Sequence, residues 1–244
     1  GGTCGKWQAP VEYLQNVLLP YLKKFVEKIE IKIIKRGYFP VGGGQVKVEI
    51  WPTLKSDDLE EILLFCNSLT KYELEFPGNL QQIRGIVNVS SDLQEQEVAE
   101  RIKSAAESAL KSLETPKTIR VEYSNTPSTG GEIVLWAVFS KDDERQDDAN
   151  NFKGSSSLVE RGKRSEQIGK EAAENLLKEI NSEFAVDNYL ADQLIPFMGL
   201  LPGSIITSNK VSNHCITNIY VTEHFLSVGF KIGEHKIIVE KKEL

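Results

Sequence analysis

His214 is the residue whose position most invites a chemical role. It lies in the stretch "SNHCITNIYVTEHFL" (212–226), after a polar turn and ahead of a run rich in β-branched residues, which predicts that the imidazole stands at the entry to a strand. Such a ring could be a packed side chain, a metal ligand or a reactive nitrogen. The other histidines, His224 and His235, follow at distances that match no zinc-binding spacing. From spacing alone, a packed ring is the commoner outcome.

The segment "YLADQL" (189–194) carries a second group of side chains that could bind a ligand. On a helix, Tyr189, Asp192 and Gln193 stand at positions i, i+3 and i+4 and therefore share one face. An aromatic face can stack on a base, and carboxylate and amide groups can hold hydroxyl or ammonium groups. The alternative is an ordinary surface helix with a half-buried tyrosine, and the spacing leaves both interpretations open.

Three consecutive glycines in "PVGGGQV" (40–46) could bring backbone N–H groups close to a phosphate. The stretch lacks the GxxxxGK[ST] pattern and precedes a strand rather than a helix, so it is neither of the standard phosphate-binding loops. A tight hairpin turn is the better interpretation.

The composition is that of a soluble globular protein of 244 residues, with 40% hydrophobic and 26% charged residues. The formal net charge of -6 argues against a protein that coats nucleic acid by bulk electrostatics. Two local basic clusters could still bind one end of an RNA, or they could simply be charged residues of a solvated surface. They consist of Lys32, Lys35 and Arg36, and of Arg161, Lys163 and Arg164.

The cysteines and the lengths of the apolar stretches indicate the cellular compartment. Cys4, Cys66 and Cys215 are far apart and form no CxxC pair, which favours neither a disulfide framework nor a cysteine zinc site. No stretch reaches the ~20 apolar residues that span a bilayer. We therefore expect a cytoplasmic protein without membrane contact. The start "GGTCGKWQAP" has no initiator methionine and is expected to continue a preceding segment.

The periodicity of apolar residues predicts an α+β fold of antiparallel hairpins with helices to one side. Helices are expected at 10–28, 94–113, 164–180 and from 187 to Pro196, and a short one in "DDLEEILLFCNSL". Strands are expected at 29–35, 45–51, in "KYELEF", and at 83–91, 118–123, 131–140, 204–207, 216–222 and 226–240, the last broken near Gly233. A charged loop is expected at 141–152, followed by a serine-rich approach to the helix at 164–180. The block 81–184 could close on its own core, which predicts a small inserted domain between a main domain at 1–80 and its continuation at 185–244.

Five stretches occur together in one order, and two of them, "YLADQLIPFMGL" (189–200) and "SNHCITNIYVTEHFL", are the specific ones. The others are "GGTCGKWQAPVEYLQNVLLPYL" (1–22), "RGYFPVGGGQVKVEI" (36–50) and "GSSSLVERGKRSEQIGKEAAENLL" (154–177). Across nearly the whole chain this set resembles the RNA 3′-terminal phosphate cyclase family, and the third stretch resembles archaeal members. Family members normally begin with a "DGSxGEGGGQ"-type segment, so roughly their first third has no counterpart here.

The resemblance implies a fold of repeated two-helix, four-stranded units with a smaller α+β domain inserted before the last. It also implies an ATP-dependent enzyme that converts an RNA 3′-phosphate into a 2′,3′-cyclic phosphodiester. In the family, the histidine of an "HxxTNI" motif attacks the α-phosphate of ATP and forms a covalent histidine–AMP adduct. The matching residue is His214, and an imidazole with an ordinary pKa near ~6.5 is a neutral nucleophile at cytoplasmic pH.

The resemblance further implies where ATP binds, with Tyr189 and Pro10 on the two faces of the adenine. The implied nucleotide-binding residues are Pro10, Tyr189, Leu190, Ala191, Asp192 and Gln193. Charge on the phosphates calls for Mg²⁺ or another divalent cation and for cationic side chains, of which Arg36 is one candidate. The metal ligands are expected in the preceding segment and stay unassigned.

A second function of a different class remains open. Some relatives keep the fold but lack the nucleophile, and the chain could be such a non-catalytic cyclase-like protein that binds RNA or partners in ribosome assembly. The presence of both His214 and "YLADQ" favours the enzyme.

Overall fold

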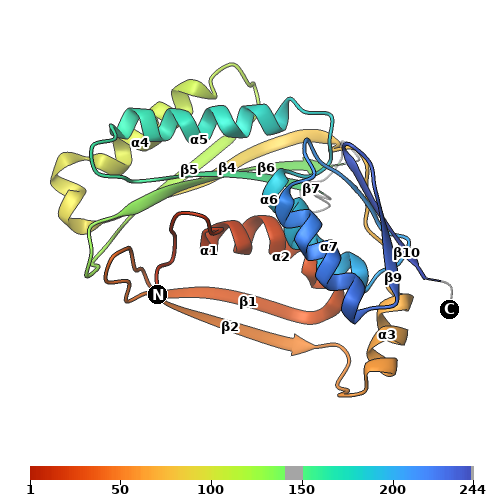
Figure 1. Ribbon diagram of the computed structural model, residues 1–244. Coiled ribbons are helices and arrows are strands. Elements are labelled where there is room, and N and C mark those ends of the chain that lie inside the picture. The colour runs from red at the N-terminus through yellow and green to blue at the C-terminus, as the bar shows by residue number, and fades with distance from the viewer. Residues whose placement is uncertain (141–150, 243–244) are drawn as a thin grey trace. The chain divides into compact units, whose positions relative to one another are not determined.

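The computed structural model describes residues 1–140 and 151–242, and the chain divides into two compact units (Figure 1). Unit 1 comprises Gly1–Val17, Glu30–Glu49 and Asn79–Asn181, and unit 2 comprises Leu18–Ile29, Ile50–Gly78 and Ser182–Leu244. Both units combine helices with a mixed sheet, so the predicted α+β class is confirmed. The domain boundaries at 80/81 and 184/185 stay a prediction for the whole protein.

Unit 1 is built on a four-stranded sheet in the order β5-β4-β6-β7. The strands are β4 Asn79–Ser90, β5 Lys117–Ser124, β6 Gly131–Ser140 and β7 Asn151–Leu158. β4 pairs parallel with β5 and antiparallel with β6, which in turn pairs antiparallel with β7. Helices α4 Val98–Ala109 and α5 Ser165–Ile180 lie side by side on one face of this sheet (Figure 1).

The core of unit 1 lies between that sheet face and the two helices. Alternate residues of the central strands, such as Val87 and Ile133, are fully buried there, as the period of two predicts. The helices touch at Gly169, where an added Cβ would lie 2.1 Å from the carbonyl oxygen of Ile102. A side chain at position 169 would therefore force α5 away from α4.

The opposite face of the sheet carries α1 Val11–Tyr13, the start of the N-terminal helical segment. The helix expected at 10–28 is shorter and irregular: it consists of α1, the π-helix η1 Leu14–Leu18, α2 Leu19–Leu22 and the 3-10 turn η2 Lys23–Phe25. Strand β1 begins at Val26, and from Ile29 its residues alternate in polarity with period two. In unit 1, Tyr13 packs on β7, where a Cβ on Gly154 would lie 2.5 Å from the tyrosine ring.

The hairpin predicted around "PVGGGQV" is confirmed. β1 Val26–Lys35 and β2 Gln45–Pro52 form a two-stranded sheet, and Gly42 N donates to Tyr38 O (2.8 Å) within the turn. Gly44 N donates to Gly1 O at 2.8 Å. Two amides of the glycine run thus serve backbone hydrogen bonds. Gly37 allows this close approach, since a Cβ there would lie 2.2 Å from Gly44 N.

Unit 2 contains a second four-stranded sheet, in the order β3-β8-β10-β9. Its strands are β3 Glu73–Leu74, β8 Ile205–Thr207, β9 Val228–Ile232 and β10 Lys236–Lys241, and its helices are α3 Leu59–Ser68, α6 Asn188–Gly199 and α7 Asn213–Phe225. β3 and β8 are parallel, whereas β10 is antiparallel to β8 and β9. In chain order β3, α6, β8, α7, β9 and β10 make a two-helix, four-stranded unit, and the segment from β4 to α5 enters between β3 and α6.

Three predictions about individual elements are wrong. The run 216–222, expected as a strand, is part of helix α7, because Cys215, Ile219 and Thr222 fall on one buried helical face. Helix α6 does not stop at Pro196 but continues to Gly199. Strand β7 lies where only a serine-rich approach to α5 was expected. The hydroxyl of its buried Ser155 has a hydrogen-bond partner, since it donates to Ala172 O at 2.7 Å.

Residues 141–150 of the predicted charged loop lie outside the described residues, and Asn151 and Phe152 begin β7. Within the described part of the chain, no helix combines the length and apolar character needed to cross a membrane.

Candidate functional site

His214 is the second residue of helix α7 and is exposed rather than sealed in apolar packing. The helix starts there because Ser212 caps it, its Oγ accepting a hydrogen bond from Cys215 N (3.1 Å). The first turn of a helix presents partial positive charge, which favours an anionic group nearby. The imidazole is therefore accessible and stands where a phosphate is favoured.

Helix α6 supplies the second group of predicted residues. Asp187 caps the helix by accepting from Tyr189 N (2.9 Å) and Leu190 N (3.0 Å). The predicted helix is confirmed, so Tyr189, Asp192 and Gln193 do stand at i, i+3 and i+4. Tyr189 is 64% exposed, whereas Asp192 and Gln193 are half-buried.

The two other residues of the "YLADQ" segment face the interior. The side chains of Leu190 and Ala191 are fully buried. Their packing holds α6 against the rest of unit 2.

His214 and Asp192 lie within electrostatic reach of each other in unit 2. Burial raises the pKa of the Asp192 carboxyl, the charge of the His214 ring lowers it, and Asp187 raises it further. The net direction is upward, so the Asp192 carboxyl holds its proton more strongly than an exposed aspartate. The structure thus brings an imidazole and a carboxyl from separate helices within reach of each other's charge.

Pro10 belongs to unit 1, in contrast to the other predicted site residues. It is the N-cap residue of α1, with an extended backbone (φ -60°, ψ 155°), and its side chain is buried. Thr3 holds this helix start, because Val11 N donates to Thr3 O at 3.1 Å. Thr3 N in turn donates to Gly37 O at 2.8 Å.

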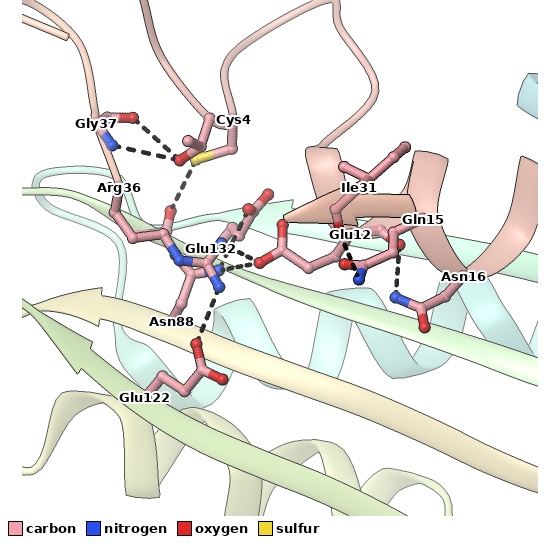
Figure 2. A network of polar contacts seen from close by, with 12 residues as sticks. Cys4, Glu12, Gln15, Asn16, Ile31, Arg36, Gly37, Asn88, Glu122 and Glu132 are labelled. Carbon is pink, nitrogen blue, oxygen red and sulfur yellow. Dashed lines mark hydrogen bonds and ion pairs between the residues drawn. The ribbon is translucent and has the colours of Figure 1, made fainter. Parts of the chain in front are cut away.

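A buried polar network in unit 1 lies beside that helix start (Figure 2). Arg36 is only 7% exposed, and its guanidinium binds Glu12 through one nitrogen and Glu122 Oε2 through the other (3.0 Å). The expectation that Arg36 meets phosphate therefore loses its basis, since both arms of the fork already bind carboxylates.

Asn88 extends this network across the sheet. Its Nδ2 donates to Glu12 Oε1 and to Glu132 Oε1, both at 3.3 Å, and its Oδ1 accepts from the Tyr38 hydroxyl at 2.6 Å. The network joins α1, β4, β6 and the hairpin turn through side chains that are all buried. It fixes the segment that carries Pro10.

Glu132 is fully buried, and its carboxyl holds its proton more strongly than that of an exposed glutamate. Burial, followed by the nearby charge of Glu12, raises its pKa well above the usual value. One oxygen on each carboxyl, Glu12 Oε2 and Glu132 Oε2, has no hydrogen-bond donor among the described residues. A neutral Glu132 that donates its proton to Glu12 accounts for both observations.

We predict that Glu132→Gln removes a pH-dependent loss of stability. Folded Glu132 keeps its proton above pH ~4.5 whereas unfolded Glu132 loses it, so its contribution is full below that pH and declines as pH rises towards the folded pKa. The slope is up to ~1.4 kcal/mol per pH unit. Glutamine donates the same hydrogen bond at every pH. Urea unfolding between pH 4.5 and 8 should therefore show Glu132→Gln gaining stability relative to the parent chain as pH rises.

The matched control for that series is Glu95→Gln, because Glu95 is exposed. Its difference from the parent should stay within about 0.5 kcal/mol across the same range. A flat difference for Glu132→Gln would contradict the shared proton.

A cleft of about 650 Å³ opens beside the network in unit 1. Its charged lining residues are Glu12, Lys32, Lys35, Arg36, Arg120 and Glu122. Since Arg36 is already paired with Glu12 and Glu122, the predicted cluster retains Lys32 and Lys35 as lining cations, joined by Arg120. The residues 161, 163 and 164 of the other basic cluster do not line this cleft.

Sequence reasoning missed the polar members of the buried network. Asn88 and Glu132 each interrupt an apolar run, "IVNVS" and "GEIVLW", on the sheet face opposite α4 and α5. A charged residue inside a strand of this kind is a signal of a buried partner. The signal does not name the partner, because Glu12 is 120 residues away from Glu132 in the sequence.

The chain is similar in sequence to known proteins of one family. The sequence model of the family "RNA 3'-terminal phosphate cyclase" matches residues 1–232. A protein of Pyrococcus abyssi named RNA 3'-terminal phosphate cyclase is 36% identical over 232 residues, which cover 95% of this chain and 60% of that protein. Proteins with the same name from Archaeoglobus fulgidus and Pyrobaculum aerophilum are each 34% identical and cover 98% of this chain and 64% of their own length.

The chain thus spans less than two thirds of the length of these curated relatives. The family match nevertheless runs from the first residue to β9 and includes both α6 and α7. The chain belongs to the RNA 3′-terminal phosphate cyclase family.

Proposed function

We propose that the chain carries the nucleotidyl-transfer centre of an ATP-dependent RNA 3′-phosphate cyclase of the cytoplasm. The observation that carries this proposal is the exposed imidazole of His214 in the first turn of α7, within electrostatic reach of Asp192 on α6. The names of the relatives support the substrate, an RNA 3′-phosphate end. The helical start supports an anionic reactant beside the ring.

The first step transfers AMP to the protein. A ring nitrogen of His214 attacks the α-phosphorus of ATP, a nitrogen–phosphorus bond forms, and the bond to pyrophosphate breaks. Partial positive charge from the first-turn N–H groups of α7 stabilises the negative charge that develops on the phosphate oxygens. The Asp192 carboxyl orients the ring through charge.

The second step hands AMP to the RNA. An oxygen of the 3′-phosphate attacks the phosphorus of the histidine adduct, and the bond to the ring nitrogen breaks. The adjacent 2′-hydroxyl then attacks the activated 3′-phosphate, closes the 2′,3′-cyclic diester, releases AMP and loses its proton to solvent or to a nearby base. The leaving groups of these two displacements, the histidine ring and AMP, depart more easily than an oxide ion would from the unactivated RNA phosphate.

The first turns of α6 hold the nucleotide in this proposal. Tyr189 stacks on one face of the adenine, and Asp192 and Gln193 bind polar groups of the nucleotide. The role of Pro10 on the other face stays a prediction from the family resemblance. The exposure of the Tyr189 side chain supports the first of these roles. Leu190 and Ala191 contribute through the position of their backbone.

A divalent cation such as Mg²⁺ would neutralise the phosphate charge when bound. The described residues contain no group of three or more His, Cys, Asp or Glu side chains that could hold a metal ion. No metal ligand is therefore assigned among residues 1–140 and 151–242.

The test uses an RNA whose 3′-terminal phosphate is radiolabelled. The chain is incubated with this RNA and ATP, alone and together with the part of the Pyrococcus abyssi relative that it does not match. We expect ATP-dependent protection of the label from phosphomonoesterase, because a cyclic diester is not a substrate for that enzyme. Absence of protection in both mixtures, with co-purification of ribosomal precursor RNA, would favour the non-catalytic cyclase-like protein instead.

A further inference from the structure

One backbone carbonyl of helix α6 lacks its usual hydrogen bond within the helix. Pro196 lies inside the helix, three residues before its end at Gly199. Proline has no N–H group, so the carbonyl four residues earlier receives no helical hydrogen bond from it. That carbonyl belongs to Asp192, a residue of the proposed site.

The side chain of Asn218 on α7 supplies the missing donor. Its Nδ2 donates to Asp192 O at 2.9 Å, and the side chain is half-buried. A hydrogen bond that normally stays within one helix is thus replaced by one between two helices. This explains why α6 continues beyond Pro196 and links its register to that of α7.

The link lies on the face of α7 that carries His214. Asn218 is four residues after His214, so the two side chains are neighbours on the helix. Asp192 accepts from Asn218 through its backbone and senses the charge of His214 through its carboxyl. The same two helices touch again at Gly199, where a Cβ would lie 2.4 Å from Thr222 Cγ2.

The neighbouring Thr217 gives an internal comparison. Its hydroxyl donates to Asn213 O at 2.9 Å, a bond within α7 that does not reach α6. A polar side chain in this turn of α7 is therefore not enough to form a hydrogen bond to α6. The bridge depends on the amide of Asn218 and on the carbonyl that Pro196 leaves open.

We propose that Asn218 is a positioning residue: by binding the Asp192 carbonyl that Pro196 leaves without a donor, it fixes the first turn of α7 and aims His214 at its reaction partner. The kinetic part of this proposal rests on the proposed function. The structural part concerns only the contact between α6 and α7. Asn218 itself need not touch ATP or RNA.

The kinetic experiment follows AMP transfer from α-labelled ATP to the chain, with the unmatched part of the Pyrococcus abyssi relative supplied. Asn218→Leu removes the donor at similar size, and Asn218→Asp keeps the shape without the N–H₂ group. We expect both to lower kcat by about 10- to 100-fold with KM for ATP changed less than about threefold, as misplacement of a nucleophile does. Thr217→Val is the matched control and should retain the parent rate.

Adding Pro196→Ala to Asn218→Leu distinguishes two roles of Asn218: holding α6 against α7, and giving the Asp192 carbonyl a hydrogen-bond donor. Alanine at position 196 returns the ordinary helical donor to Asp192 O. In the double variant with Asn218→Leu we expect kcat to stay low, because the tether between the helices is still absent. Full recovery of kcat in the double variant, or a parent-like rate in both Asn218 variants, would overturn the proposal.

A measurement that needs no ATP keeps this inference separate from the proposed function. Carbon NMR titration of the Asp192 carboxyl reports the pull of His214, which lowers the pKa of Asp192. In the parent background, His214→Ala should raise that pKa; in the Asn218→Leu background, the rise should be clearly smaller. Equal rises in the two backgrounds would overturn the positioning role, whereas absent AMP transfer in the parent with unequal rises would defeat only the proposed function. Circular dichroism confirms that each variant is folded.

Discussion

His214→Ala is expected to abolish transfer of AMP from ATP to the protein, with a loss of about 10³-fold or more in rate, because no other group replaces a missing nucleophile. The side chain is exposed and holds no part of the core, so the variant should unfold at the same urea concentration as the parent. The measurement is the initial rate of protein labelling by α-labelled ATP in the presence of the unmatched part of the Pyrococcus abyssi relative.

His224→Ala is the matched control, since this second histidine lies on the same helix and is also exposed. Its ring contacts Tyr220 O at 2.7 Å near the other end of α7. Labelling should proceed at the parent rate in this variant. Equal labelling of His214→Ala and the parent would place the nucleophile elsewhere.

Arg36→Met is expected to cause the largest loss of stability, about 3–5 kcal/mol in the free energy of unfolding. Methionine fills a similar volume but leaves Glu12 buried beside Glu132 without its cation. An unpaired charge in that position costs more than the lost hydrogen bonds themselves. Urea titration followed by circular dichroism measures the change.

Two variants define the cause of that loss. Adding Glu12→Gln to Arg36→Met removes the orphaned charge and should recover a large part of the stability. Arg120→Met changes an exposed arginine of the same cleft and should stay within about 0.5 kcal/mol of the parent. A loss of similar size for Arg120→Met, or none for Arg36→Met, would contradict the role assigned to the network.

The sequence predicted those elements whose pattern and packing agree. Strand β6 has the predicted bounds 131–140, and the helix predicted at 164–180 begins at residue 165. In α5 the buried positions follow the helical period, whereas every residue of β6 is buried, as its long apolar run indicates. The face of α6 that carries Tyr189, Asp192 and Gln193 was predicted for the same reason, because helical spacing fixes which residues are neighbours.

Helix α7 was mispredicted because its local preference and its packing disagree. The run from Ile216 to Thr222 is rich in β-branched residues, which favour strands. Tertiary packing overrode that preference, since Cys215 and Ile219 are buried at a spacing of four. Ser212, three residues before Cys215, was the available helix-start signal.

The continuation of α6 past Pro196 could not be predicted from local sequence. It depends on Asn218, which lies 22 residues further on and supplies the donor that proline lacks. The Glu12–Arg36–Glu132 network is likewise assembled from separate parts of the chain. Periodicity assigns residues to faces, but it does not pair faces that are distant in sequence.

The role of His214 came from the resemblance to the family and not from its spacing, which favoured a packed ring. The structure adds that the ring is exposed at a helix start. Exposure leaves the ring nitrogens accessible to a reactant.

Mass spectrometry of the protein after incubation with ATP tests this most directly. Trypsin releases residues 211–231 as one peptide, which contains both His214 and His224. The account predicts the mass of one AMP on this peptide, retained in alkali, lost in acid and confined to fragment ions that include residue 214. AMP on any other residue, or none when the unmatched part of the Pyrococcus abyssi relative is present, would contradict it.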